Sequence, residues 1–283
     1  MPITMTRFFL LALCALLLVP SALAQSAGDV LREALDRYEA EMADVNDYTI
    51  TQEVVGSEVT MYAEREEGAG PLAYTHYLVT PGGLQNVGDD RAATSNPYLM
   101  LERITDEAAY GGTEDVEGIR SHVITVDDFG DLAREMGAVP EQAEGEFDID
   151  EATFYLSTDD YRLRKMTMEG TMTNDGQTSP VRLETVLSDY RTTDGFTTPY
   201  HMAMTMQGME GQMSDAEREE ARQQLEQARQ QMEQMPAEQR QMMERMMGDR
   251  LEQLEQMLGG DGFSMEMIVK NVDVNTGRPT GGQ

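Results

Sequence analysis

Apolar and polar residues alternate along this chain over a series of short segments that are separated by turn residues. A period of two is typical of β-strands with one buried face, because successive side chains point to opposite sides of a sheet. Two of the intervening turns, Asn174-Asp175-Gly176 and Asp194-Gly195, contain the Asp-Gly pair that tolerates the positive φ angles of a tight hairpin. The alternating segments are residues 48–55, 59–65, 73–79, 118–127, 152–156, 161–173, 181–190, 198–207 and 263–274. Roughly nine or ten strands in succession predict a large, strongly curved antiparallel sheet or barrel.

Three helices are expected beside these strands. The segment Ser26 to Val45 places apolar residues at spacings of three and four, which is typical of an amphipathic helix, and Asp29 near its start suits the positive end of the helix dipole. Its apolar stripe contains Val30, Leu31, Ala34, Leu35, Tyr38, Met42 and Val45. Because such a stripe must be buried, we expect this helix on the concave side of the sheet. Two shorter helices are expected at 96–104 and 129–136.

An insertion separates the last two expected strands. Ser214 and Glu217 have the spacing of a capping box, and Pro236 divides the segment that follows into two helical stripes. We therefore expect a helical hairpin at 214–258 within a single domain that spans residues 25–283. One interpretation is a lid over the open end of the sheet, and the other is a hairpin that only packs or meets a partner protein. The lid residues would be Leu225, Met232, Met247 and Leu254.

The N-terminus has the three parts of a secretory signal. Arg7 precedes the apolar run Phe8 to Val19, and Ser21 to Ala24 supplies a small-residue cleavage site. The run is shorter than the ~20 apolar residues that span a bilayer, although a retained anchor is the alternative interpretation. We expect residues 1–24 to be a cleaved signal peptide. The mature protein would then be periplasmic, with no integral membrane segment.

The charge balance excludes some classes of partner. The chain has 52 Asp and Glu against 21 Lys and Arg, a net charge of −31, and Lys165 and Lys270 are its only lysines. Nucleic acids and anionic membrane surfaces are bound through clustered basic residues, so neither is expected as a partner. Such acidity is typical of proteins that work in high salt, where screening weakens self-repulsion, or of a surface that is simply very soluble.

Catalytic and metal-binding signatures are missing from the sequence. There is no G-x-S-x-G elbow, H-E-x-x-H motif or P-loop, and Cys14 would leave with the signal peptide. The three histidines are far apart in sequence, and Asp159-Asp160 and Asp194 lie in expected turns, where turn formation is their ordinary role. We predict a protein that is not an enzyme and that has no cofactor and no metal site, although a carboxylate pair in a cleft would escape such a sequence search.

Methionine is the most informative residue type, with 23 in the chain. Three expected strands each place apolar residues, mostly Met, at alternate positions, so each set shares one face. Met is flexible and polarizable, which suits a soft-walled cavity for an acyl chain; the alternative is a closed core that uses Met. The candidate acyl-binding residues are Met166, Met168, Met172, Met202, Met204, Met206, Phe263, Met265, Met267 and Val269. The clusters Met202 to Met213 and Met242 to Met247 also allow Cu(I) binding, because thioethers are soft ligands.

Several short motifs resemble the periplasmic lipoprotein carrier LolA and related lipoprotein-sorting proteins. The expected first helix runs into a strand with the triplet Ile50-Thr51-Gln52, and the phrase Y-x-x-x-D-G-x-x-x-P occupies 190–199. The segments GPLAYTHYLVTPGG at 70–83, STDDYRLRKMTMEG at 157–170 and MEMIVKNVDVNTGRP at 265–279 are also similar to that family. The resemblance implies an unclosed β-barrel whose helices fill the mouth and whose hollow holds acyl chains without catalysis. The insertion at 214–258 and the strong acidity depart from the family pattern.

These observations predict a mainly β (α+β) fold, an unclosed and strongly curved antiparallel β-barrel with helices on its concave side and an inserted helical hairpin. The expected function is that of a periplasmic carrier that shelters the acyl chains of a lipid or lipoprotein. Its expected process is outer-membrane lipoprotein sorting, and an inner- or outer-membrane protein is expected as a further partner. An envelope-stress sensor on the same fold and a Met-rich Cu(I)-binding protein are the alternatives.

Overall fold

The computed structural model describes residues 25–66, 70, 72–86, 97–135, 146–174, 176–208 and 263–279, together with residues 219, 223, 225–227 and 230. The expected signal peptide at 1–24 and nearly all of the expected hairpin at 214–258 lie outside the described residues.

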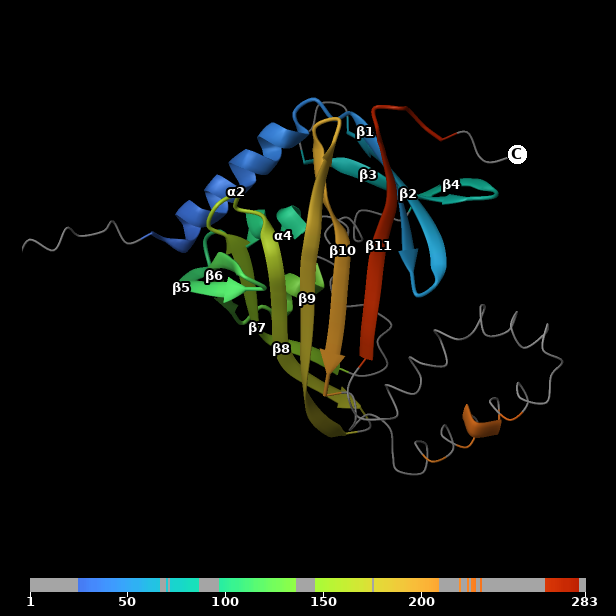
Figure 1. Ribbon diagram of the computed structural model, residues 1–283. Coiled ribbons are helices and arrows are strands. Elements are labelled where there is room, and N and C mark those ends of the chain that lie inside the picture. Colours follow the sequence, from blue (N-terminus) through green and yellow to red (C-terminus); the bar gives the residue numbers. More distant parts are fainter. Residues whose placement is uncertain are drawn as a thin grey trace, which may run out of the picture.

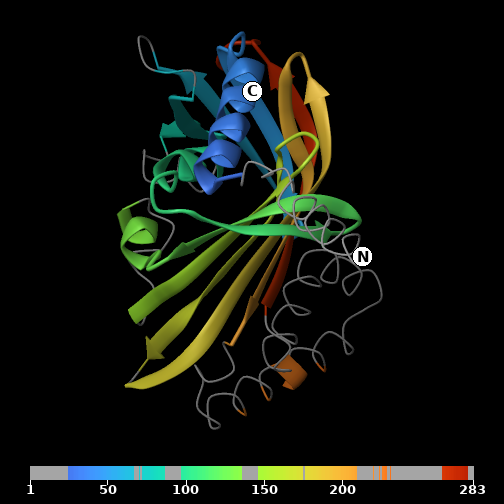
Figure 2. The ribbon, with the colours of Figure 1, turned by 90° about the vertical axis from the view of Figure 1, so that its left-hand side faces the viewer.

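One antiparallel sheet contains all eleven strands that the structure describes, in the order β4-β3-β2-β1-β11-β10-β9-β8-β7-β6-β5. The sheet curves strongly without closing, so that β4 and β5 form its two edges (Figures 1 and 2). This confirms the predicted unclosed antiparallel barrel. The strands are β1 (Asp47–Val54), β2 (Ser57–Arg65), β3 (Tyr74–Thr80), β4 (Gly83–Asn86), β5 (Ala109–Val116), β6 (Ile119–Asp127), β7 (Glu146–Ser157), β8 (Leu163–Asn174), β9 (Gln177–Thr193), β10 (Phe196–Gln207) and β11 (Phe263–Val274).

The first and last strands pair at the centre of the sheet. In the register of β1 and β11, Tyr48 lies opposite Val274 and Val54 lies opposite Met267, with a β-bulge after Thr51. The bulge leaves Lys270 as an extra residue of β11 between the partners of Thr51 and Gln52. Two runs of sequential hairpins, β1 to β4 and β5 to β10, are thus joined through β11.

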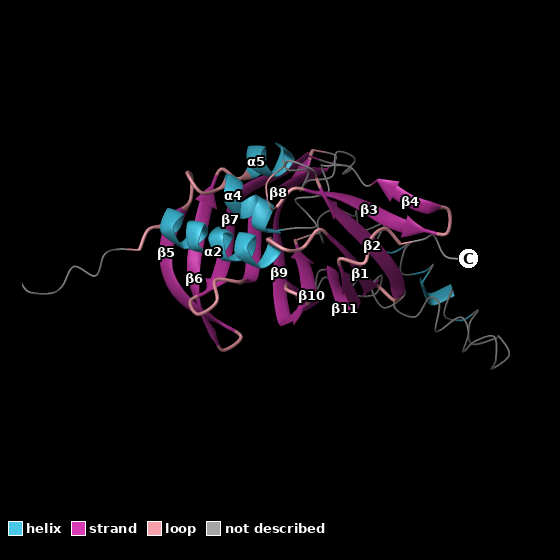
Figure 3. Cartoon of the chain, turned by 90° about the horizontal axis from the view of Figure 1, so that it is seen from above, coloured by secondary structure: helices cyan, strands magenta, loops and turns pink. Residues whose placement is uncertain are grey.

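Three helices, α2 (Ala27–Met42), α4 (Pro97–Arg103) and α5 (Gly130–Glu135), lie on the concave side of the sheet (Figure 3). Ser26 caps α2, because its Oγ accepts a hydrogen bond from the Asp29 amide at 3.1 Å. The whole apolar stripe expected for this helix is buried, including Val45, which follows the last helical residue. On α4, Tyr98 stacks on Tyr38 of α2 with 4.0 Å between ring centroids. The stripe therefore lies in the core, as predicted.

The end of α2 is tied to the sheet by side chains of β2 and β3. Arg65 Nε donates to the Val45 carbonyl at 3.0 Å, and a second guanidinium nitrogen donates to the Met42 carbonyl. Tyr74 donates its hydroxyl hydrogen to the Val45 carbonyl at 2.6 Å. The Met42 carbonyl belongs to the last turn of α2, where carbonyls lack intrahelical partners, and the Val45 carbonyl belongs to the loop that follows. These bonds fix the helix over the sheet and so set which part of the concave face it covers.

Two strands were not expected from the sequence, β4 and β5, and both lie at edges of the sheet. The strand β7 begins at Glu146, earlier than the expected Ala152, and β9 extends to Thr193. Among the described residues, no helix combines the length and hydrophobicity needed to cross a bilayer.

Candidate functional site

A single register row crosses six strands of the sheet and brings the methionine sets together. Directly opposite residues on neighbouring antiparallel strands project to the same face. The row begins with Ile124 and Phe154, which are fully buried in the core, so it lies on the concave face. From β6 to β11 its members are Ile124, Phe154, Met166, Thr185, Met204 and Met265.

Parallel rows place the remaining candidate residues on this same face. Met202 lies opposite Met267, and Met172 lies opposite Phe147. Val269, opposite Gln52 of β1, lies two residues from Met267 along β11. A second long row contains Val126, Ala152, Met168, Leu183 and Met206, and the backbone of Phe263 pairs with that of Met206. The structure thus gathers all three predicted sets on the concave face, which we call the methionine face and define as Met166, Met168, Met172, Met202, Met204, Met206, Met265 and Met267.

The members of the methionine face differ in burial. Met168 is buried with 5% of its surface exposed, and Met166 and Met202 pack partly against the core cluster. The other members of the face are half-buried and do not belong to that cluster. In Figures 1 and 2 the described helices cover the upper part of the concave face, and β8 to β11 extend below them. The half-buried methionines are therefore the ones nearest to an incoming apolar ligand.

One polar group lies within the methionine face. Thr185 lies between Met166 and Met204 in the row and is 4% exposed. Its Oγ1 is buried and has no hydrogen-bond partner among the described residues. A buried hydroxyl without a partner is unfavourable, so this atom is a candidate to donate to a polar group of a ligand. Sequence reasoning missed Thr185, although the alternation of Val181, Leu183 and Leu187 around it marks its position on the apolar face.

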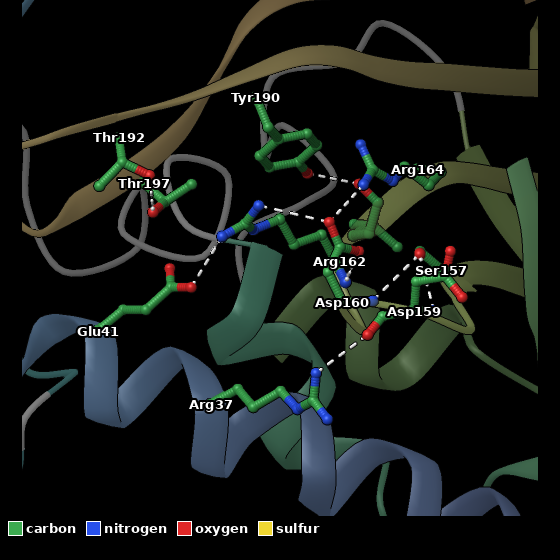
Figure 4. Close-up of polar contacts among 11 residues, drawn as sticks. Arg37, Glu41, Ser157, Asp159, Asp160, Arg162, Arg164, Tyr190, Thr192 and Thr197 are labelled. Carbon is green, nitrogen blue, oxygen red and sulfur yellow. Dashed lines mark hydrogen bonds and ion pairs between the residues drawn. The ribbon is translucent and has the colours of Figure 1, made fainter.

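A second polar cluster lies where α2 meets the β7–β8 turn (Figure 4). The Asp160 carboxylate accepts hydrogen bonds from the Arg162 amide at 3.1 Å and from the Arg164 guanidinium at 2.6 Å. Burial raises the pKa of this carboxyl, but the hydrogen bonds from Arg162 and Ser157 and the two nearby guanidinium groups outweigh it. The net effect holds the pKa of Asp160 below its usual value. Asp160 is therefore ionised under ordinary conditions and neutralises part of the arginine charge.

The same cluster joins α2 to the sheet. Arg162 also donates to Glu41 of α2 at 2.9 Å, and Arg37 of α2 donates to the Asp159 carbonyl at 3.2 Å. The Arg164 guanidinium lies 4.8 Å from the centre of the Tyr190 ring. Figure 4 shows these side chains converging from α2, the turn and β9. The sequence predicts only turn formation for Asp160. This residue also carries the contact with α2, which no sequence pattern marks because the partners are far apart in the chain.

Two of the three histidines are buried and hydrogen-bonded to tyrosines. His76 Nε2 lies 3.2 Å from the Tyr48 hydroxyl, and His122 Nδ1 lies 3.2 Å from the Tyr110 hydroxyl. Burial lowers the pKa of both imidazoles, which keeps them neutral at neutral pH. In the part of the chain that the structure describes, His, Cys, Asp and Glu form no group of three or more that could hold a metal ion.

Of the expected lid residues, only Leu225 is described. It lies in a helical segment and is half-buried, and Met232, Met247 and Leu254 lie outside the described residues. The lid therefore remains a prediction.

Comparisons with known proteins give structural neighbours but no sequence relatives. No family model matches the sequence, and no curated protein matches it. A solved outer membrane lipoprotein-sorting protein domain from Vibrio parahaemolyticus is 12% identical, with 88% of this chain and 93% of that chain covered and a TM-score of 0.41. A LolA superfamily protein from Nitrosomonas europaea is 6% identical, with 89% and 94% covered and a TM-score of 0.36. A DUF1329 family protein from Desulfovibrio piger is 10% identical, with 88% and 95% covered and a TM-score of 0.35.

Proposed function

We propose that this protein is a non-enzymatic carrier that shelters an acyl chain of a lipid or lipoprotein on its methionine face. The observation that supports it is the register row from Met166 through Met204 to Met265, which brings methionines of three strands onto one face, with Thr185 of β9 between the first two. Methionine side chains adapt to varied apolar shapes, which suits acyl chains of different length. Removing apolar surface from water contributes roughly 25 cal/mol per Å², from which the entropic cost of association is subtracted.

Thr185 adds a polar contact to this proposal. Its buried Oγ1, which lacks a partner among the described residues, lies within the face. An acyl chain is attached to a carbonyl group, and a hydroxyl can donate to that oxygen. The ligand would then place its chain over the methionines and its carbonyl near Thr185.

The cellular role is part of the proposal and rests on the sequence. The signal-peptide pattern at 1–24 supports export to the periplasm, and the motif resemblance supports a role in outer-membrane lipoprotein sorting. A membrane protein that delivers or receives the ligand would be the partner. An envelope-stress sensor would use the same fold but would bind a protein instead of extracting lipid.

Charge placed on the methionine face tests the acyl site. The triple variant Met166→Asp, Met204→Asp and Met267→Asp should lose binding of a fluorescent fatty acid, because the charges would enter an apolar surface. The same three positions changed to Leu should keep it. A single Ile268→Asp change is the matched control on the same sheet, since Ile268 is exposed and alternates with Met267.

Circular dichroism must show that each variant is folded. A folded Asp triple variant that binds the fatty acid as tightly as the parent contradicts the acyl site. Mass spectrometry of organic extracts, from protein purified without detergent, identifies the natural ligand.

A further inference from the structure

Four methionines of β10 and β11 form a compact group within the methionine face. Met202 lies directly opposite Met267, and Met204 lies directly opposite Met265. Opposite Cβ atoms of an antiparallel pair are ~5 Å apart, and residues two apart on one strand are ~7 Å apart. The four Cβ atoms therefore mark a rectangle of roughly 5 by 7 Å on one side of the sheet. We call Met202, Met204, Met265 and Met267 the thioether quartet.

The side chains of the quartet can converge. All four are half-buried, and none belongs to the closed core cluster, although Met202 packs against it. Met has three rotatable side-chain bonds, so sulfur atoms that start from so small a rectangle can turn toward one point above it. Three or four thioethers around one point form the ligand set of a soft metal ion.

The described residues directly opposite the quartet in the adjoining strands carry no imidazole or carboxylate group. In the adjoining strands, Leu187 lies opposite Met202, Thr185 lies opposite Met204, and Val54 of β1 lies opposite Met267. His201 and Glu266, which alternate with the methionines of the quartet along β10 and β11, project to the other face. His201 Nε2 lies 3.8 Å from a Glu266 carboxylate oxygen there.

We propose that the thioether quartet is a binding site for a soft monovalent metal ion, Cu(I) or its analogue Ag(I). Thioethers are neutral and soft, and they select Cu(I) over Zn²⁺ and Cu²⁺, which prefer imidazole and carboxylate ligands. A monovalent ion is also less costly than a divalent one to place in an apolar site with neutral ligands. Metal binding is a function distinct from acyl binding. It requires sulfur ligands, whereas an acyl chain requires only an apolar surface.

Replacement of sulfur without loss of hydrophobicity tests the site. The quadruple variant Met202→Leu, Met204→Leu, Met265→Leu and Met267→Leu keeps size and apolar character. Titration of the full-length mature protein with Ag(I), followed by calorimetry, should show one equivalent fewer bound by this variant than by the parent. The matched control changes Met166, Met168 and Met172 to Leu, on the same face but outside the quartet, and should keep that equivalent. Zn²⁺ should not compete for it.

Spectroscopy completes the test. X-ray absorption of the Cu(I)-loaded protein should show sulfur ligands only, and oxygen or nitrogen ligands would overturn the proposal. Unchanged Ag(I) stoichiometry and affinity in the quadruple variant would also overturn it, since the metal would then be bound by other methionines. Binding of the fluorescent fatty acid is measured in parallel, and it plays no part in accepting or rejecting the metal site. Failure of the acyl proposal, seen with the Asp triple variant, is thus measured separately from failure of the metal site.

Discussion

At the scale of single residues, Asp160 links the turn, the sheet and the first helix. It accepts hydrogen bonds from Arg162 and Arg164, and Arg162 in turn reaches Glu41 on α2. Its neighbour Asp159 uses its backbone carbonyl toward Arg37 and has an exposed side chain. Two adjacent aspartates therefore have different roles, which allows a matched comparison.

Changing Asp160 to Asn should lower the free energy of unfolding by about 1–3 kcal/mol, because the half-buried Arg162 and Arg164 would lose their shared anion. The Asp159→Asn variant removes the same charge from an exposed position and should change stability by less than about 0.5 kcal/mol. Urea unfolding at neutral pH measures both. Equal losses of unfolding free energy in the two variants would show that the change in net charge determines the loss, and that the contact of Asp160 with the arginines does not.

Alternation along each strand was enough to predict which methionines share a face, because the period of two assigns sides without any knowledge of partners. It did not predict that the three sets meet in one row, since this requires the register between strands. Thr185 and the Arg162–Glu41 contact were missed for the same reason. The two residues of that contact are 121 positions apart in the chain.

At the scale of elements, the strands that sequence reasoning missed are the two edges. The strand β5 contains two glycines, and most of its side chains are exposed. The strand β4 has only four residues. An edge strand is paired on one side only, and short or polar edges protect a sheet from unwanted pairing. Such strands lack the alternation of apolar and polar residues that marks the central strands. Their sequences are therefore typical of loops.

The insertion at 214–258 is the element whose role stays a prediction. A connection that long between adjacent antiparallel strands is far beyond the usual two to five residues of a hairpin loop. We expect the insertion to slow ligand release by covering the methionine face. Replacing 214–258 with a short Gly-rich turn should leave the sheet folded and speed the release of bound fatty acid, measured by stopped-flow fluorescence.

The control for this deletion is a chain in which Leu225, Met232, Met247 and Leu254 are changed to Gln within the intact insertion. If these residues contact the ligand or the methionine face, this variant should release fatty acid as fast as the deletion. Release at the parental rate from a folded deletion variant would contradict the lid and favour a partner-binding hairpin.

At the scale of the whole molecule, the net charge of −31 should make stability depend on salt. Self-repulsion among carboxylates destabilises the compact state, and 1 M salt shortens the screening length to about 3 Å. We expect the melting temperature to rise steeply from dilute buffer to molar NaCl, by roughly 2–4 °C for each kcal/mol of repulsion removed. Choline chloride at equal ionic strength should give a similar rise. A flat profile in both salts would show that the acidity serves solubility alone.

The position of β11 also has a consequence for the order in which the chain can assemble. Strands β1 to β4 and β5 to β10 are each built from sequential hairpins, so both runs form from contacts that are local in sequence. Of the eleven described strands, the one that joins the two runs is synthesised after the other ten. Beside this junction the Asn46 amide donates to the Asn275 side chain, 229 residues away. Contacts of such separation form late and slowly. Until residues 263–274 are in place, β1 and β10 are both unpaired edges, and the sheet exists only as two separate halves.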